Sequence, residues 1–133
     1  MMSDWLVFAN EKKCNHARAL HELGYISWRQ ERVRFAIGDI VYLFMSDERY
    51  IRFKTVVVAA NQERGDGKYW NGIAPKDKTY KLEFVEEYNG NALCESELFK
   101  HGFHGGRSLQ HPIKNNPRLF EYIKEEFTKL AQR

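Results

Sequence analysis

The sequence predicts an α+β domain in which a small curved sheet or partial barrel is built around a central hairpin. The hairpin is expected between Ala36 and Ala60, where two runs dense in β-branched and aromatic residues flank the short charged link 47–49. The first run, 36–46, has almost no polar alternation, which is typical of a strand buried on both faces. Helical signals near both ends of the chain complete the α+β pattern.

Length and composition indicate one globular domain that spans residues 1–133. Hydrophobic residues make up 43% of the chain and charged residues 29%, which is ordinary for a domain that buries a substantial core. Aromatic residues reach 14%, a surplus that must fill the core, a binding surface or both. The net charge of +3 does not by itself indicate a nucleic-acid partner. Basic residues concentrate in the first half, however, and separated charge can orient a polyanionic ligand.

Cysteine usage and the first residues suggest a cellular compartment. No apolar run approaches the roughly 20 residues needed to span a bilayer. The start, Met1-Met2-Ser3-Asp4, lacks the basic segment of a signal peptide. The two cysteines, Cys14 and Cys94, lie far apart in the chain, and intracellular redox conditions disfavour a disulfide between them. We therefore expect a reduced, cytoplasmic protein with no membrane partner.

The segments before the hairpin predict a strand and a short helix. Residues 5–9 are continuously apolar and are expected to form a strand. A helix is expected from about 16 to 23, with Asn15 as its N-cap and Gly24 at its C-terminal stop. Residues 25–30 are expected to be an extended loop or a short strand.

The segments after the hairpin predict a loop, a strand and a closing helix. A weakly structured, mobile loop is expected over 61–78, and a strand with one exposed face over 79–88. One or two helical turns are expected at 96–101, followed by a glycine-rich loop or short strand at 103–112. The clearest helix signal is an apolar stripe over 117–130, with Asn116 as the cap and Pro117 at the first helical position.

The order of these segments resembles the EVE domain of the PUA-like superfamily. Four segments carry the resemblance: Trp5-Leu6-Val7-Phe8, the Trp28 loop, Gly38-Asp39-Ile40-Val41-Tyr42 with its apolar return strand, and Arg107-Ser108-Leu109-Gln110. The resemblance implies a PUA-like, EVE-type pseudobarrel of five to six mostly antiparallel strands with flanking helices. It also implies a pocket for a modified nucleobase, as in the base-reading modules fused to modification-dependent HNH endonucleases.

The site residues of such a reader are aromatic walls and basic phosphate contacts. Aromatic side chains stack on an extruded base, and basic side chains position the backbone without reading sequence. Further candidates are the tyrosines Tyr42 and Tyr80 for the aromatic walls, and the cations Arg32, Arg49 and Lys54 for the phosphate contacts. The predicted site residues are Asn10, Ser27, Trp28, Arg29, Phe44, Ser46, Arg52, Trp70, Arg107 and Gln110. The alternative for each aromatic is a place in the core, and for each charge an exposed face.

Catalytic and metal-binding patterns are weak. The spacing of Cys94, His101, His104 and His111 matches no familiar zinc pattern. Cys14 and His16 lie at a helix start, where neighbouring residues do not face each other, so they make a poor catalytic pair. We therefore expect a non-catalytic module that needs no cofactor.

Three functions remain open from the sequence. The first is a nucleic-acid reader that flips a modified base, with a modified cytosine in DNA favoured over RNA, and with an effector nuclease acting in trans. The second is a small metal-dependent hydrolase or nuclease that uses the loop from His101 to His111. The third is a protein-interaction domain that uses an exposed sheet edge.

Overall fold

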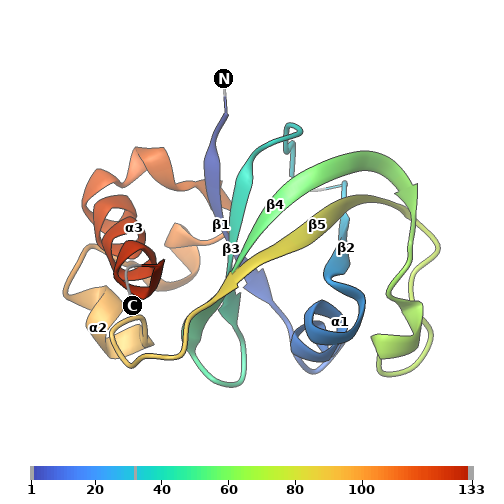
Figure 1. Ribbon diagram of the computed structural model, residues 1–133, viewed down its shortest axis with the longest axis horizontal. Coiled ribbons are helices and arrows are strands. Elements are labelled where there is room, and N and C mark those ends of the chain that lie inside the picture. The colour runs from blue at the N-terminus through green and yellow to red at the C-terminus, as the bar shows by residue number, and fades with distance from the viewer. Residues whose placement is uncertain (1, 32, 132–133) are drawn as a thin grey trace.

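The predicted central hairpin consists of β3 (Ile40–Met45) and β4 (Tyr50–Glu63), which pair antiparallel. The computed structural model describes residues 2–31 and 33–131 (Figure 1). Its six strands form one sheet in the order β2-β5-β4-β3-β1-β6, so the hairpin occupies the middle of the sheet. Every described residue of β3 except Ile40 is buried, which confirms that this strand is covered on both faces.

The other four strands extend the sheet on both sides of the hairpin. On one side β1 (Asp4–Ala9) runs parallel to β3 and pairs with the two-residue β6 (His111–Pro112). On the other side β5 (Lys78–Glu87) pairs with β4, and β2 (Tyr25–Arg29) pairs with β5. All of these pairs except β1–β3 are antiparallel. The structure therefore confirms an α+β fold with a six-stranded, mostly antiparallel mixed sheet.

The long strands β4 and β5 arch along the sheet (Figure 1). Their pairing shifts register in three places, and such irregularities bend a strand and increase its twist. Because Gln62 and Glu63 still pair with Thr79 and Lys78, the predicted loop from residue 61 is wrong for its first three residues. A short helical turn, η1 (Gly67–Tyr69), follows and adds further structure to the 61–78 segment.

Helix α1 (His16–Leu23) has the predicted bounds and the predicted caps. The Asn15 Oδ1 atom accepts a hydrogen bond of 3.1 Å from the Arg18 N–H, which satisfies one free donor of the first turn. Gly24 ends the helix with a φ of 80°, a left-handed conformation that glycine adopts without steric cost, and its N–H bonds to the Leu20 carbonyl. The local sequence therefore determines both ends of this helix.

The C-terminal half supplies the second layer. Helix α2 (Glu95–Phe99), the turns η2 (Gly105–Ser108) and η3 (Ile113–Asn115), and helix α3 (Pro117–Ala131) follow β5. Leu119, Ile123 and Phe127 form the buried stripe of α3, and the Phe127 ring lies 5.3 Å from that of Tyr42. The helix therefore packs on the central hairpin through its apolar stripe. In the described part of the chain, no helix is both long enough and apolar enough to span a membrane.

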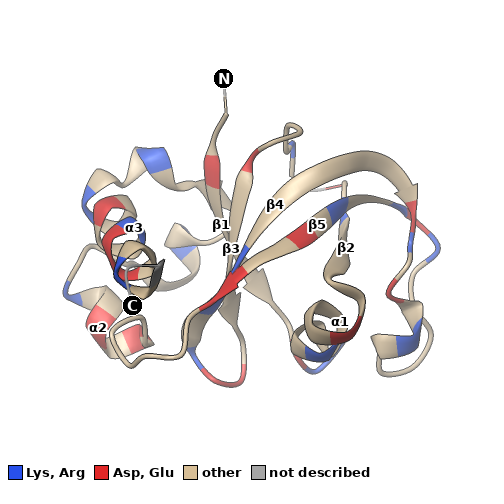
Figure 2. Ribbon diagram, in the orientation of Figure 1, with Lys and Arg blue, Asp and Glu red and all other residues tan. Residues whose placement is uncertain are grey.

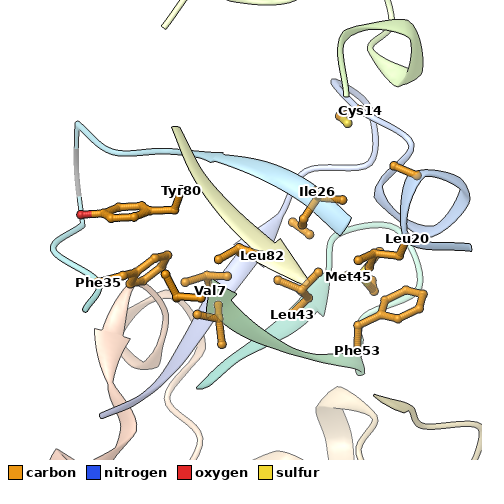
Figure 3. Close-up of a cluster of buried hydrophobic side chains, with 14 of the residues drawn as sticks. Val7, Cys14, Leu20, Ile26, Phe35, Leu43, Met45, Phe53, Tyr80 and Leu82 are labelled. Carbon is orange, nitrogen blue, oxygen red and sulfur yellow. The ribbon is translucent and has the colours of Figure 1, made fainter. Parts of the chain in front are cut away.

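The two faces of the sheet bury separate cores. Val7, Leu43, Met45 and Phe53 point to the side of α1, where they pack with residues such as Ile26, Leu20 and Leu82 (Figure 3). The alternate residues Leu6, Tyr42 and Phe44 point to the side of α3. This alternation follows from the two-residue period of a strand. The cavity described next lies beside α1.

Candidate functional site

A cavity of about 200 Å³ opens beside α1, between the segment after β1, the strand β2 and the segment after β4. These elements lie together at the right of Figure 1, on the opposite side of the molecule from α3. The cavity walls are Phe8, Asn10, Lys13, Cys14, His16, Ser27, Trp28, Arg29, Arg64, Trp70 and Pro75. Two tryptophans from distant parts of the sequence therefore meet at one hollow.

Trp70 is held in this wall by backbone pairing between two connections. The Asn15 N–H donates to the Tyr69 carbonyl at 2.9 Å, and the Asn71 N–H donates to the Lys13 carbonyl at 2.9 Å. Between these bonds, Cys14 and Trp70 form an isolated antiparallel bridge. The segment predicted as a mobile loop is thus attached to the start of α1, and it closes one side of the cavity.

A buried ionic cluster, which includes the wall residue Arg64, supports the part of the wall that Trp70 forms. The Asp66 carboxylate accepts hydrogen bonds from the Ser27 N–H at 2.9 Å, the Trp70 Nε1–H at 3.2 Å and the Arg64 Nη1–H at 3.1 Å. Arg64 also forms a bidentate pair with Asp77, with two bonds of 3.0 Å. The Arg64 guanidinium lies 4.7 Å from the centre of the Trp70 ring. This cluster fixes the position of Trp70 relative to β2.

In this cluster one guanidinium, that of Arg64, is paired with two carboxylates, those of Asp66 and Asp77. Burial disfavours the charged form of Arg64, but hydrogen bonds and charges from Asp77 and Asp66 nevertheless raise its pKa above the ordinary value. Only 6% of the Arg64 side chain and 1% of the Asp66 side chain are exposed. A ligand in the cavity therefore meets rings, uncharged polar groups and the cations Lys13 and Arg29, because the charges of Arg64 and Asp66 already have partners.

Trp28, on the edge strand β2, forms another part of the cavity wall. It pairs across the strands with Tyr80, is half-buried, and its ring centre lies 5.8 Å from that of His16. Trp28 also lines an adjoining hollow together with Lys13, Arg29, Val33 and Gln110. The tryptophan therefore stands between the cavity and a second surface that carries two cations.

Cys14 and His16 are both cavity residues, but their chemistry is unsuited to nucleophilic catalysis. Burial raises the pKa of the Cys14 thiol to about 12, and the nearby Asp66 carboxylate adds to this shift. Burial lowers the pKa of His16 to about 4, although Asp66 opposes this effect. At neutral pH the thiol keeps its proton, and a thiol is a far weaker nucleophile than a thiolate.

Six of the predicted site residues lie at or beside the cavity. Asn10, Ser27, Trp28, Arg29 and Trp70 form part of its wall, and Gln110 lines the adjoining hollow. Four wall residues of chemical interest were not predicted: Lys13, Cys14, His16 and Arg64. Sequence patterns did not single out Arg64, because its partners Asp66 and Asp77 also resemble ordinary loop residues.

The other four predicted residues lie elsewhere. Phe44 is fully buried and stacks on Phe103, with ring centres 5.4 Å apart, so it belongs to the core on the α3 side. The Ser46 Oγ atom accepts a hydrogen bond from the Glu11 N–H at 2.8 Å. Arg52 pairs with Glu87 at 2.8 Å and with Glu48 at 2.9 Å. Arg107 lines a separate hollow near the start of α3.

The remaining candidates for aromatic walls and phosphate contacts are mostly committed to other contacts. Tyr42 is buried, and the hydroxyl of the buried Tyr80 donates to the Val33 carbonyl at 3.1 Å. Arg49 pairs with Glu95 at 2.6 Å. Figure 2 shows acidic and basic residues side by side within β5, α1 and α3, so the charge separation along the sequence is largely lost in space. Arg32 lies outside the described residues.

The histidine-rich segment does not form a metal cluster in the part of the chain that the structure describes. No group of three or more His, Cys, Asp or Glu side chains is placed to hold a metal ion there. The His101 ring stacks on Tyr122, with centres 3.6 Å apart. His104 and His111 line the separate hollow near α3.

Comparisons with known proteins inform the fold alone. No protein-family model matches the chain, and no curated protein matches it. A solved structure of a hypothetical protein from Leishmania major superposes with a TM-score of 0.57 and 18% sequence identity. The match covers 100% of this chain and 98% of that one. The chain therefore shares its overall architecture with that protein over its full described length.

Proposed function

We propose that this chain is a non-catalytic, PUA-like module of the EVE type that binds nucleic acid and takes a modified base into the cavity between Trp28 and Trp70. The observation that carries this proposal is the meeting of the two tryptophans at one hollow lined by Asn10, Ser27 and Arg29. Aromatic side chains hold an extruded base by stacking, and polar side chains bind its edge.

The size of the cavity favours a single planar ring system. Its volume of about 200 Å³ lies below the roughly 300–1,000 Å³ typical of pockets for drug-sized ligands. Each stacked base contributes about 1–3 kcal/mol of binding free energy, which is comparable to the few kcal/mol needed to unstack and unpair it. A base that already stacks or pairs poorly is therefore favoured as the ligand.

The two cations at the cavity mouth suit the backbone on either side of an extruded base. Lys13 and Arg29 line both the cavity and the adjoining hollow. Arg29 is 47% exposed, and its contacts to Asp77 and Glu31 are long, at 3.4 and 3.6 Å. Such loosely paired cations can bind phosphate without strong competition from the protein. A modified cytosine in DNA is the ligand that we favour, with an effector nuclease acting in trans.

The test is a binding screen with two substitutions of Trp28. Oligonucleotides of DNA and RNA that carry different modified cytosines or adenines are titrated against the wild type, Trp28→Phe and Trp28→Leu. Phe retains a stacking face, whereas Leu keeps apolar bulk without one. We expect the Leu variant to lose about 1–3 kcal/mol of binding free energy and the Phe variant to lose less. Phe99→Leu, an exposed aromatic on α2, is the control.

Melting temperatures separate binding from folding. A fully buried aromatic residue costs about 3–5 kcal/mol of stability when it is truncated to alanine, so a large fall in melting temperature would place Trp28 in the core. Two results would contradict the proposed function. One is equal affinity for modified and unmodified strands, and the other is equal affinity of the wild type, Trp28→Phe and Trp28→Leu for the modified strand.

A further inference from the structure

His16 is a buried polar residue of the cavity wall whose ring has no hydrogen-bond partner among the described residues. It is the first residue of α1, and only 7% of its surface is exposed. Its Nδ1 atom is buried and has no hydrogen-bond partner. Within the described residues, no protein group hydrogen-bonds to the His16 ring. Buried polar groups in folded proteins are nearly always paired. Because neither ring nitrogen has a partner in the described part of the protein and Nδ1 is inaccessible, Nε2 is the atom of this ring that a ligand in the cavity would meet.

The neighbouring polar groups of the wall are committed to other contacts. Arg64 and Asp66 bond to each other and to surrounding groups. The Ser27 Oγ atom accepts a hydrogen bond from the Gly65 N–H at 3.0 Å, and the Asn10 Oδ1 atom accepts one from the Lys12 N–H at 3.1 Å. His16 differs from these groups because neither nitrogen of its ring is bonded to the described part of the protein.

The environment of the ring also determines its tautomer. An uncharged imidazole carries one N–H donor and one bare nitrogen acceptor. A proton on Nδ1 would leave a buried N–H without an acceptor, and buried N–H groups without a partner are rarer than under-satisfied acceptors. The proton therefore belongs on Nε2, which makes the accessible part of the ring a hydrogen-bond donor.

The orientation in which a base enters the cavity determines which of its atoms the Nε2–H group of His16 meets. The sugar is attached on one side of a base and must stay at the cavity mouth with the backbone, so the opposite, Watson–Crick edge enters first. At the centre of that edge cytosine and adenine carry an unprotonated ring nitrogen, whereas thymine, uracil and guanine carry an N–H. Two donors that face each other leave both unpaired, which excludes the second group.

We propose that His16 is the base-selecting residue of this cavity, and that its Nε2–H donates to the unprotonated ring nitrogen of a cytosine-type or adenine-type base. This inference rests on the proposed function and adds to it the residue that selects the base. It predicts rejection of thymine-type and uracil-type bases, which stack equally well but offer a donor at that place.

The experiment compares four DNA probes and three proteins. Two probes carry 5-methylcytosine or N6-methyladenine, which keep the ring nitrogen free. Two carry 3-methylcytosine or 1-methyladenine, in which a methyl group occupies it and leaves the base positively charged. The charge affects all three proteins alike, so the hydrogen bond is measured as the part of the preference that His16→Phe loses. The proteins are the wild type, His16→Phe, which fills the same space without a donor, and His16→Gln, which restores an N–H. Melting temperatures confirm that each variant is folded.

We expect the wild type to bind at least one probe with a free ring nitrogen about tenfold more tightly than its blocked counterpart, the effect of one buried hydrogen bond. His16→Phe should lose this preference and His16→Gln should recover part of it. Nitrogen NMR of the histidine ring should show the proton on Nε2 and a shift of that signal when the preferred probe is added.

Different results would overturn different claims. If the probes bind and His16→Phe keeps the full preference, or if the proton lies on Nδ1, the inference about His16 is wrong while the base-binding function stands. If neither the methylated probes nor any oligonucleotide of the wider screen binds, the proposed function fails and the role of His16 fails with it.

Discussion

Lowering the pH should destabilise this protein through His16. The effect should begin at a higher pH than the protonation of the aspartate and glutamate side chains. Burial lowers the pKa of His16 from 6.5 in the unfolded chain to about 4 in the folded one. Between these two values the unfolded state binds a proton that the folded state excludes. Stability therefore falls as the pH is lowered through this range, because protons favour the state that binds them.

The size of the effect follows from the two pKa values. Each pKa unit of difference corresponds to about 1.4 kcal/mol. Linkage over the interval from pH 7 to pH 5 gives a loss of about 2 kcal/mol in the free energy of unfolding from this one residue. A domain with typical stability of about 5–15 kcal/mol shows such a change clearly.

Urea denaturation measured at several values between pH 7 and pH 5 provides the assay. The wild type should lose stability over this interval, and His16→Phe should lose about 2 kcal/mol less, whatever its absolute stability. His104→Phe serves as the matched control, because the His104 side chain is exposed. Parallel pH profiles for the wild type and His16→Phe would show that His16 is not a buried neutral base, and would refute this reasoning.

Three further predictions follow from the ionic cluster, the cations and the thiol. Asp66→Asn should destabilise the fold by about 3–5 kcal/mol in chemical denaturation, because it leaves the buried Arg64 without one of its charged partners; a loss below 1 kcal/mol would contradict the role of the cluster. The logarithm of affinity should fall linearly with the logarithm of salt concentration, and Lys13→Ala should reduce that slope by about 1, whereas Arg52→Ala, which removes a cation paired with Glu87, should not. Cys14 should resist alkylation by iodoacetamide at pH 7 in the native protein, and rapid native-state modification would show that the thiol is not held protonated by burial.

Local sequence was sufficient for the elements that depend on neighbouring residues. The caps Asn15 and Gly24 determine both ends of α1, because a cap satisfies backbone groups only a few residues away. The unbroken apolar run 40–45 identifies a strand that is covered on both faces. The apolar stripe of α3 identifies the face that packs on the hairpin, since the helical repeat places those side chains together.

Tertiary structure decided which of the predicted residues form the cavity. Phe44 and Trp28 are both strand aromatics, and only the covering of β3 by α3 makes one a core residue while the other remains half-exposed on an edge strand. Arg52 and Arg64 each acquire a carboxylate partner from another part of the chain, which residue type alone does not reveal.

By itself, the sequence determined the central hairpin, the capped helices α1 and α3, and the presence of tryptophans outside the continuous apolar runs. These features depend on backbone periodicity and on contacts within a few residues. The meeting of Trp28 with Trp70, the burial of Asp66 and the unpaired ring of His16 were decided only by the fold. They depend on the pairing of segments about 40 or more residues apart, which strand order and register bring together.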